Sequence, residues 1–419
     1  MVVFSSKVLT SCGTILFVVI LNWLFDASVT GQCMAFIAWC LGLSLLCKFG
    51  SELYLVKNCS MADSDNNSKG FWHYVDTVTI FTLFNTTIVI FLLYIIKINI
   101  SDMLIVDRIE SLIVILPVFN FLAIGSAILK SINKAEIALF FEIGSITFVL
   151  SGIIFLVSLM GWEIDGSDIF NFFFIVCFLL AFVLFFFISM TCPKRIMNKD
   201  IYKSYSLNFF LELSDFFIPS FLHYALQWGS IIALGFFVSD ALVGVFSTAQ
   251  RFSYLINFIL IVVNMITAPK FAVLFKNGNI KEIEKLSINT ANFMSVMIIF
   301  VTPAIFFLLP FFSPMLKDGD GVVIFLIFVI GQAVNVITGS VGVLLNMTGH
   351  ERSMRNIMLL STLITLILFI FLTYFFGILG ASISISLGLI MQNSLASWKV
   401  YSLLRIRSLP TFLHRVFYK

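Results

Sequence analysis

Residues 169–190 read IFNFFFIVCFLLAFVLFFFISM, a run without a single charged side chain. About 20 apolar residues in a helix are enough to cross the roughly 30 Å hydrocarbon core of a bilayer. The run therefore predicts a membrane-spanning helix. The rest of the chain agrees, because 60% of its 419 residues are hydrophobic and only 11% are charged. In a soluble domain about a quarter of the residues are charged, so no large soluble domain is expected in this chain.

Eleven further apolar runs have a similar length, which gives twelve predicted spans. Their expected bounds are 8–25, 31–47, 77–96, 111–129, 137–160, 169–190, 208–236, 241–268, 288–311, 321–346, 356–376 and 378–398. The first run is interpreted as a span and not as a signal peptide, since no small-residue cleavage site follows it. The predicted fold class is an all-α integral membrane protein with twelve transmembrane helices.

The positions of the basic residues predict the orientation of these spans. With a cytoplasmic N-terminus, 21 of the 25 lysines and arginines lie in cytoplasmic segments. Cytoplasmic loops of membrane proteins carry this excess of positive charge. Both termini are therefore expected in the cytoplasm. The polar stretch 48–76 is expected to be a flexible cytoplasmic loop, and the outer loops are too short for an extracellular domain.

Two pairs of similar segments indicate an internal duplication. Residues 26–31 resemble residues 240–244 at an offset of 214, and residues 129–134 resemble residues 345–350 at an offset of 216. Six spans per half make the two halves parallel repeats, an arrangement known from transporters with the substrate path between the halves. We expect an N-terminal six-helix lobe, 1–203, and a C-terminal six-helix lobe, 204–419.

Four charged residues fall inside or at the edge of predicted spans, where charge is costly. Arg251 is near mid-depth, and we interpret it as a fixed cation that attracts an anionic substrate such as a pyrophosphate; pairing with a carboxylate or with carbonyls is the structural alternative. Glu142, Glu212 and Asp215 are candidates for proton or cation coupling. Glu212 and Asp215 share one helix face because they are three residues apart.

Uncharged polar residues also occur in apolar spans. Gln227, Gln250, Asn264, Gln332 and Asn335 are candidate substrate-binding residues that could recognise sugar hydroxyls. The alternative is hydrogen bonding between helices. Four scattered histidines and seven cysteines without a CxxC pair predict neither a metal site nor a cofactor.

Three segments carry a resemblance to a known family. They are Gly-Val-Phe-Ser-Thr-Ala-Gln-Arg at 244–251, Gly-Ser-Val-Gly-Val-Leu-Leu-Asn-Met-Thr-Gly-His-Glu at 339–351, and Phe-Gly-Ile-Leu-Gly-Ala at 376–381. These segments resemble the Wzx-type O-antigen flippases of the multidrug/oligosaccharidyl-lipid/polysaccharide (MOP) exporter superfamily. The motifs are structural and not catalytic, so they indicate the superfamily better than the substrate.

The resemblance implies two six-helix lobes that form a MATE-like V around a central cavity. It implies a transporter of the bacterial inner membrane, not an enzyme. The cargo would be an undecaprenyl-pyrophosphate-linked oligosaccharide, moved from the cytoplasmic to the periplasmic leaflet by alternating access, with coupling to an ion gradient possible. Implied partners are the lipid bilayer and the polymerase and chain-length regulator of the same pathway; no nucleic acid is expected.

Three other classes of membrane protein are weighed against this one. A MATE-type cation-coupled exporter would typically carry a carboxylate in the first span, and residues 8–24 have none. A lipid II flippase would usually have fourteen spans. An O-antigen polymerase should carry a large periplasmic loop. The flippase stands first among them, the exporter second.

Overall fold

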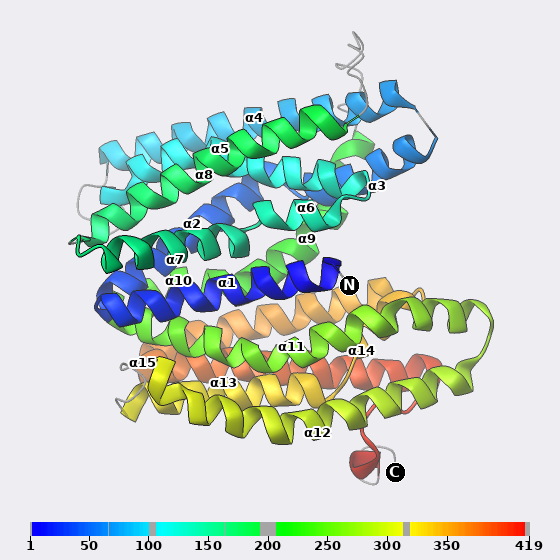
Figure 1. The fold of residues 1–419 in the computed structure, drawn as a ribbon. Helices are drawn as coiled ribbons and strands as arrows, with labels where there is room; N and C mark the ends of the chain where they lie inside the picture. The colour runs from blue at the N-terminus through cyan, green and yellow to red at the C-terminus, as the bar shows by residue number, and fades with distance from the viewer. Residues whose placement is uncertain are drawn as a thin grey trace. The chain divides into compact units, whose positions relative to one another are not determined.

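The computed structural model describes residues 2–65, 67–99, 106–162, 164–192, 207–312 and 319–414. All regular secondary structure in these ranges is helical (Figure 1). The chain divides into two compact units, the first made of Met1–Phe25 and Gln32–Ile232 and the second of Asp26–Gly31 and Ala233–Lys419. Residues 207–232 thus group with the first unit. The lobes 1–203 and 204–419 remain a prediction.

The first unit is a bundle of long apolar helices. Its helices are α1 (Val2–Leu24), α2 (Ala27–Lys48), α3 (Ser51–Ser64), α4 (Ser68–Asn99), α5 (Val106–Ser131), α6 (Ala135–Ala138), α7 (Ile143–Leu159), α8 (Gly166–Thr191) and α9 (Leu207–Tyr224). A 3-10 turn, Leu139–Phe141, precedes α7, and a π-helical turn, Ala225–Gly229, joins α9 to α10 (Ser230–Gly235). Helix α1 packs on α7, and α5 packs on α3, α4 and α8.

The second unit is also a bundle of long apolar helices. Its helices are α11 (Asp240–Lys276), α12 (Ile280–Phe312), α13 (Gly319–Ile337), α14 (Val341–Met347) and α15 (Glu351–Leu404), followed by a 3-10 turn, Thr411–Leu413. Helix α13 packs between α11 and α15, and α14 packs on α15. Gly377 has non-helical angles, φ 57° and ψ −135°, and divides α15 into two helices. The division matches the predicted boundary between spans 356–376 and 378–398.

The expectation of a flexible loop at 48–76 is wrong, because most of it is helical, in α3 and in the first turns of α4. Gly50 has a positive φ of 79° and turns the chain between α2 and α3. Tyr54, Leu55, Cys59 and Ala62 are buried against α4, α5 and α9. Their spacing places them on one helix face. The burial of this face fixes a segment that is polar in overall composition.

Two predicted spans, 137–160 and 321–346, have different bounds in the structure. Span 137–160 breaks at Glu142, where the backbone is extended and the helices on either side differ in direction by 54°. Span 208–236 is confirmed as the candidate span Phe209–Gly235, which contains the π-helical turn. Span 321–346 ends early, because α13 stops at Ile337 and Gly339, with a φ of 81°, separates it from α14.

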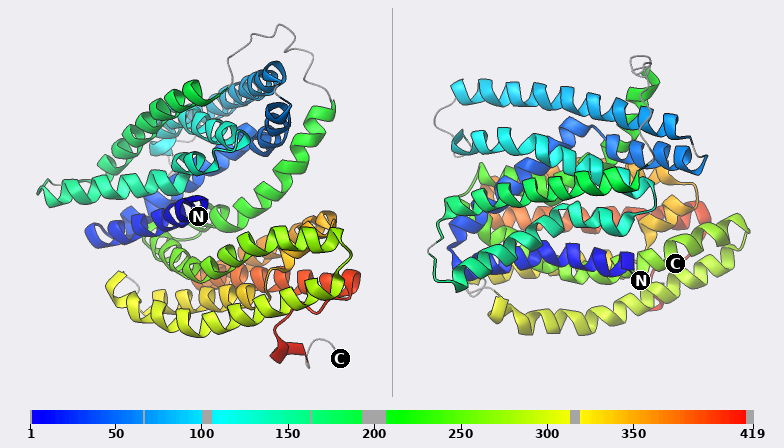
Figure 2. Two further views of the ribbon diagram at one scale, coloured as in Figure 1. Left: turned by 45° about the vertical axis from the view of Figure 1, so that its right-hand side comes forward. Right: turned by 45° about the horizontal axis from the view of Figure 1, so that its top comes forward.

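Nine helices in the described ranges are long and apolar enough to cross a membrane, or ten if the bent pair Ala135–Phe141 and Ile143–Leu159 counts as one span. In the first unit, the N-terminus, α3 and the connection from α5 to α6 lie at one end of the bundle (Figures 1 and 2). The connections from α1 to α2 and from α7 to α8 lie at the opposite end. This is the alternation that the charge pattern predicts.

The two segments proposed as repeats contact each other within the second unit. A side chain on Gly31 would overlap the carbonyl oxygen of Asp240, and a side chain on Gly244 would overlap that of Ala27. Each glycine thus faces the residue four positions before the other glycine. Such a reciprocal contact is the pattern that a two-fold relation produces. It supports the internal duplication inferred from residues 26–31 and 240–244.

Candidate functional site

Helix α11 presents a stripe of polar side chains along one face. Gln250, Tyr254, Asn257 and Asn264 follow one another at intervals of four, three and seven residues, which aligns them on a helix. Gln250 is completely buried, and neither its amide nitrogen nor its amide oxygen has a hydrogen-bond partner. The oxygen of the Asn264 amide is also buried without a partner. Buried amides of this kind are uncommon and indicate strain or an absent ligand or water.

Arg251 lies beside this stripe and is only 3% exposed. Its guanidinium carbon lies 5.5 Å from the centroid of the Tyr254 ring, which gives a cation–π contact. A guanidinium keeps its charge in almost any protein environment. The second unit therefore holds a cation inside its helix bundle, next to unsatisfied amides.

A network of amides joins α11, α13 and α15. The Asn335 side-chain nitrogen donates to the oxygens of Asn257, at 3.2 Å, and Gln332, at 3.3 Å. The Asn393 side-chain nitrogen donates to the Asn335 oxygen at 3.0 Å. Asn335 thus makes the interhelical hydrogen bonds that were the alternative to a substrate role, whereas the hydrogen bond of Gln332 to Asn335 lies within α13. Asn257 was missed by the sequence, although it shares the α11 face with Gln250.

The remaining predicted residues lie elsewhere. Gln227 is half-buried in the π-helical turn of the first unit, whereas the other five candidate binding residues belong to the second unit. Glu212 and Asp215 lie on exposed positions of α9. Glu142 caps α7 and accepts a hydrogen bond from the Lys130 ammonium at 2.7 Å. Of the three predicted coupling carboxylates, Glu212 and Asp215 therefore lie on α9, whereas Glu142 lies at the start of α7.

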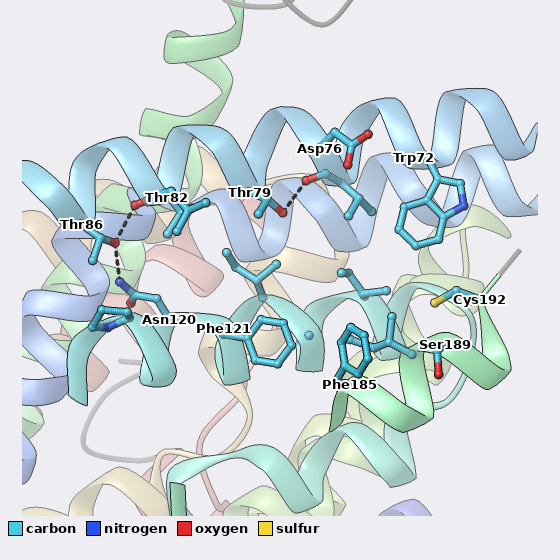
Figure 3. Close-up of a pocket in the computed structure, with 17 residues that line it drawn as sticks. Trp72, Asp76, Thr79, Thr82, Thr86, Asn120, Phe121, Phe185, Ser189 and Cys192 are labelled. Carbon is cyan, nitrogen blue, oxygen red and sulfur yellow. Dashed lines mark hydrogen bonds between the residues drawn. The ribbon is translucent and has the colours of Figure 1, made fainter. Parts of the chain in front are cut away.

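A cavity of about 490 Å³ lies in the first unit between α4, α5 and α8 (Figure 3). Three aromatic side chains, Trp72, Phe121 and Phe185, line it, and among the described lining residues Asp76 alone is charged. Its volume is in the range of small-molecule sites. The cavity was not predicted, because Asp76 directly precedes the apolar run 77–96 and reads as the end of a polar loop.

Hydroxyl and amide groups form a chain at one end of this cavity. The Asn120 amide donates to the Thr86 hydroxyl at 2.8 Å, and the Thr86 hydroxyl donates to the Thr82 carbonyl at 2.6 Å (Figure 3). On the other side, the Ser44 hydroxyl donates to the Asn120 amide oxygen at 2.6 Å. The Thr82 hydroxyl lines the cavity and is buried without a partner. The cavity is thus apolar and aromatic with a few fixed polar groups.

No cluster of three or more histidine, cysteine or acidic side chains that could hold a metal ion occurs in the part of the chain that the structure describes. The seven cysteines are free thiols, and most of them are buried.

Solved structures with the same fold are transporters. The inward-facing structure of a multidrug resistance MATE family transporter of the MOP superfamily is 15% identical, covers 94% of each chain and has a TM-score of 0.67. The chain has the fold of the MATE transporters. The outward-facing structure of such a transporter is 13% identical, with 96% and 94% of the two chains covered and a TM-score of 0.64.

A second kind of protein shares this MATE-type fold. The lipid II flippase MurJ, in an inward closed conformation, is 14% identical, with 96% of this chain and 87% of that chain covered and a TM-score of 0.67. Both neighbours are MOP superfamily members. No protein-family model matches the sequence, and neither does any curated protein. At these identities the similarity shows the fold alone, and the long apolar helices indicate a multi-pass membrane protein.

Proposed function

We propose that this chain is a flippase of the bacterial cytoplasmic membrane that moves an undecaprenyl-pyrophosphate-linked oligosaccharide from the cytoplasmic to the periplasmic leaflet. The buried Arg251 guanidinium carries the proposal, because a pyrophosphate needs a cation inside a bundle that otherwise excludes charge. Support comes from the MATE-type fold, which solved neighbours show in inward-facing and outward-facing forms. One of the neighbours is itself named a flippase.

The proposed topology has twelve spans with both termini in the cytoplasm. Ten spans follow from helix length and composition when the bent pair counts as one. That count treats α15 as a single span, although Gly377 divides α15 into two helices. It omits α1, whose described apolar part is the shorter helix Cys12–Leu24. Dividing α15 and adding α1 brings ten to twelve.

In this proposal Arg251 binds the pyrophosphate, and the amide side chains on and near α11 bind the sugars. Arg251 attracts the pyrophosphate, and Gln250 and Asn264 supply amides to sugar hydroxyls. Asn335 holds α13 against α11 through Asn257, and Gln332 and Asn335 can exchange their mutual hydrogen bond for bonds to sugar. Gln227, in the π-helical turn of the first unit, is a separate candidate for binding sugar hydroxyls. Amide groups suit this role because they both donate and accept hydrogen bonds.

Coupling to an ion gradient is part of the proposal. Glu212 and Asp215 are exposed on α9, where each carboxylate can exchange a proton or bind a cation. Glu142 can do so only by releasing Lys130, since the two side chains are 2.7 Å apart. The polymerase and the chain-length regulator of the same pathway are the proposed protein partners.

Arg251 variants test the proposal in a strain that lacks the chromosomal copy of this gene. Arg251→Ala should lower surface polysaccharide by about tenfold or more, because a charge-assisted hydrogen bond contributes about 1.5–3 kcal/mol and 1.4 kcal/mol is a factor of ten. Lipid-linked repeat units should accumulate in the cytoplasmic leaflet. Arg251→Lys keeps the charge and should retain part of the activity. The measurements are surface polysaccharide, lipid-linked intermediates and protein abundance.

Arg352→Ala is the matched control, because Arg352 is an exposed arginine of the same unit. It should leave export unchanged. Normal surface polysaccharide in Arg251→Ala, at normal protein abundance, would remove Arg251 from the mechanism. Unpolymerised single repeat units at the surface of the deletion strain would instead indicate the O-antigen polymerase.

The second candidate function is a MATE-type exporter of small lipophilic cations. The 490 Å³ cavity of the first unit favours it, since Asp76 and three aromatic side chains suit a flat cation. Efflux of rhodamine 6G from cells that overproduce the protein tests this function. Export that depends on Asp76, lost in Asp76→Asn but kept in the control Asp65→Asn, would establish the exporter. Asp65 is an exposed carboxylate at the end of α3.

A further inference from the structure

Two ion pairs of the first unit line one cavity of about 260 Å³. The Lys48 ammonium pairs with the Glu52 carboxylate, and the Lys130 ammonium pairs with the Glu142 carboxylate at 2.7 Å. Each pair joins a lysine in the last turn of one helix to a glutamate at the start of another. A cation at a helix C-terminus and an anion at an N-terminus are both favourable to the helix dipoles. The pairs thus have a structural role that does not require a ligand.

Three of these four side chains remain partly accessible, whereas Lys48 is buried. The exposed fraction is 10% for the Lys48 side chain and 39% for that of Glu52, and 36% and 28% for those of Lys130 and Glu142. Ion pairs in contact with solvent contribute little free energy, typically below about 1 kcal/mol. A charged ligand can therefore exchange with either pair at low cost.

The charges in the cavity balance. Two ammonium groups and two carboxylates face it, and no other charged side chain is among its described lining residues. An anion would be repelled by Glu52 and Glu142, and a cation would be repelled by Lys48 and Lys130. A zwitterion whose two charges are separated by a few bonds is complementary to both pairs.

The rest of the wall is apolar and runs away from the charged end. Along α5 the lining residues pass from Phe119 and Leu122 through Ser126 to Lys130. At 1.5 Å per residue, Phe119 and Lys130 are about 16 Å apart along the helix. The cavity is therefore charged where α2 and α5 end and apolar toward the middle of the bundle, which is the polarity of a lipid at the membrane boundary.

We propose that this cavity binds the headgroup of a zwitterionic phospholipid that carries a primary ammonium, as in phosphatidylethanolamine. The lipid phosphate accepts hydrogen bonds from Lys48 and Lys130, and the lipid ammonium donates to Glu52 and Glu142. A phosphocholine headgroup has the same net charge but no N–H donor for the carboxylates. The volume of about 260 Å³ fits a headgroup and the first carbons of its chains, not a whole lipid.

Thermal unfolding of the purified full chain tests the proposal. The probes are phosphatidylethanolamine, phosphatidylcholine and phosphatidylglycerol with identical acyl chains, each added to the protein in mixed micelles. Phosphatidylethanolamine should raise the unfolding midpoint by several degrees more than the other two, because ligand binding to the folded state stabilises it. Equal shifts with all three lipids would overturn the proposal.

Variants assign the effect to this cavity. Glu142→Gln and Glu52→Gln should each reduce the preference for phosphatidylethanolamine. The double swap of Lys130→Glu with Glu142→Lys keeps an ion pair and the charge balance, so it should fold and retain the preference. Lys97→Gln breaks the pair of Lys97 with Glu110, which joins α4 to α5 outside the cavity, and should leave the preference unchanged.

A further arm separates a lipid from a soluble ligand. Equal stabilisation by free phosphoethanolamine would assign the cavity to a soluble zwitterion and overturn the lipid assignment. An unchanged lipid preference in both Glu52→Gln and Glu142→Gln would place the lipid elsewhere and also overturn it. The assay measures stability and not export, so its result is independent of the flippase proposal.

Discussion

At the scale of single residues, glycines decide how closely helices pack. A side chain on Gly13 would overlap the Gly144 carbonyl oxygen where α1 meets α7. Gly31 and Gly244 do the same for α2 and α11. Small residues let helix backbones approach and replace the hydrophobic driving force that is absent between helices in lipid. These contacts join segments that are more than a hundred residues apart in the sequence.

Gly244→Ala should destabilise the protein, because the atom that the new methyl group meets is a backbone carbonyl and cannot rotate away. Inserting a group into a packed interface costs about 1–3 kcal/mol. Gly152→Ala is the control, since a side chain there meets nothing within 4 Å. It should be neutral or stabilising by about 0.5–1 kcal/mol, the gain in helix propensity. Unfolding midpoints in detergent measure both; a Gly244→Ala midpoint as high as that of Gly152→Ala would contradict the close contact.

The sequence predicted which polar residues in apolar helices make specific contacts. It predicted less well which side chains they contact. An amide in an apolar run must find a hydrogen bond, so Gln332 and Asn335 were expected to contact another helix. The helix that supplies the partner depends on tertiary packing, and for this reason Asn257 was missed. Arg251 was recognised as a costly charge, but its contact with Tyr254 depends on side-chain direction. Asp76 was missed because its cavity forms only when α4, α5 and α8 pack together.

At the scale of elements, α3 shows how burial overrides composition. Its residues 51–64 include three charged side chains, and their polarity predicts a loop. However, the Cys59 side chain is completely buried, with its sulfur 3.8 Å from the Phe71 carbonyl oxygen. Desolvation raises the pKa of the Cys59 thiol to about 12, and the nearby Cys192 and Asp63 add to the rise. Helix α3 is thus packed against α4 as firmly as a core helix.

The raised pKa of Cys59 predicts a loss of stability in alkaline solution. Below about pH 9 the thiol is protonated in both the folded and the unfolded state. As the pH rises from about 9 to 12, the unfolded state releases its proton and the folded state keeps it, so folding stability falls by up to about 1.4 kcal/mol per pH unit. The difference in unfolding free energy between the wild type and Cys59→Ala, measured from pH 8 to pH 11, isolates this group.

Burial of the Tyr54 hydroxyl raises its pKa to about 12 as well, and Cys59→Ala does not remove that contribution. The wild type should therefore lose stability above pH 9 faster than Cys59→Ala does, while both lose it above pH 10. Parallel pH profiles of the two proteins would show that the Cys59 thiol titrates normally and that α3 is loosely packed.

Breaks inside helices were the elements that sequence reasoning placed least well. Glu142 stands between apolar runs, and the sequence alone does not distinguish a charge inside a helix from a cap at a break. The structure shows a cap, with the carboxylate paired to Lys130. Gly377 was placed correctly, because a glycine between two long apolar runs with a positive φ of 57° ends one helix and starts the next.

At the scale of the whole molecule, the alternation of basic residues along the chain predicts the topology better than any sequence motif does. Basic residues recur at alternate connections, and in the first unit the ends of α2 and α5 and the start of α4 carry Lys48, Lys130 and Lys69. A helical bundle with this alternation could be predicted because each crossing reverses the direction of the chain. The grouping of residues 207–232 with the first unit could not, since it depends on the packing of α9 against α3.

The topology makes a direct prediction for labelling by a membrane-impermeant maleimide in intact cells. Single cysteines are placed in a background without the accessible native thiols, Cys12 and Cys192. Trp162→Cys, in the exposed connection from α7 to α8, should react when the reagent is added from the periplasmic side. Asp65→Cys, after α3, and Asn277→Cys, after α11, should react only once the inner membrane is permeabilised, because their connections carry the basic residues that stay in the cytoplasm. Labelling of Asn277→Cys but not Trp162→Cys in intact cells would invert the orientation, and with it the direction of transport proposed for the lipid-linked cargo.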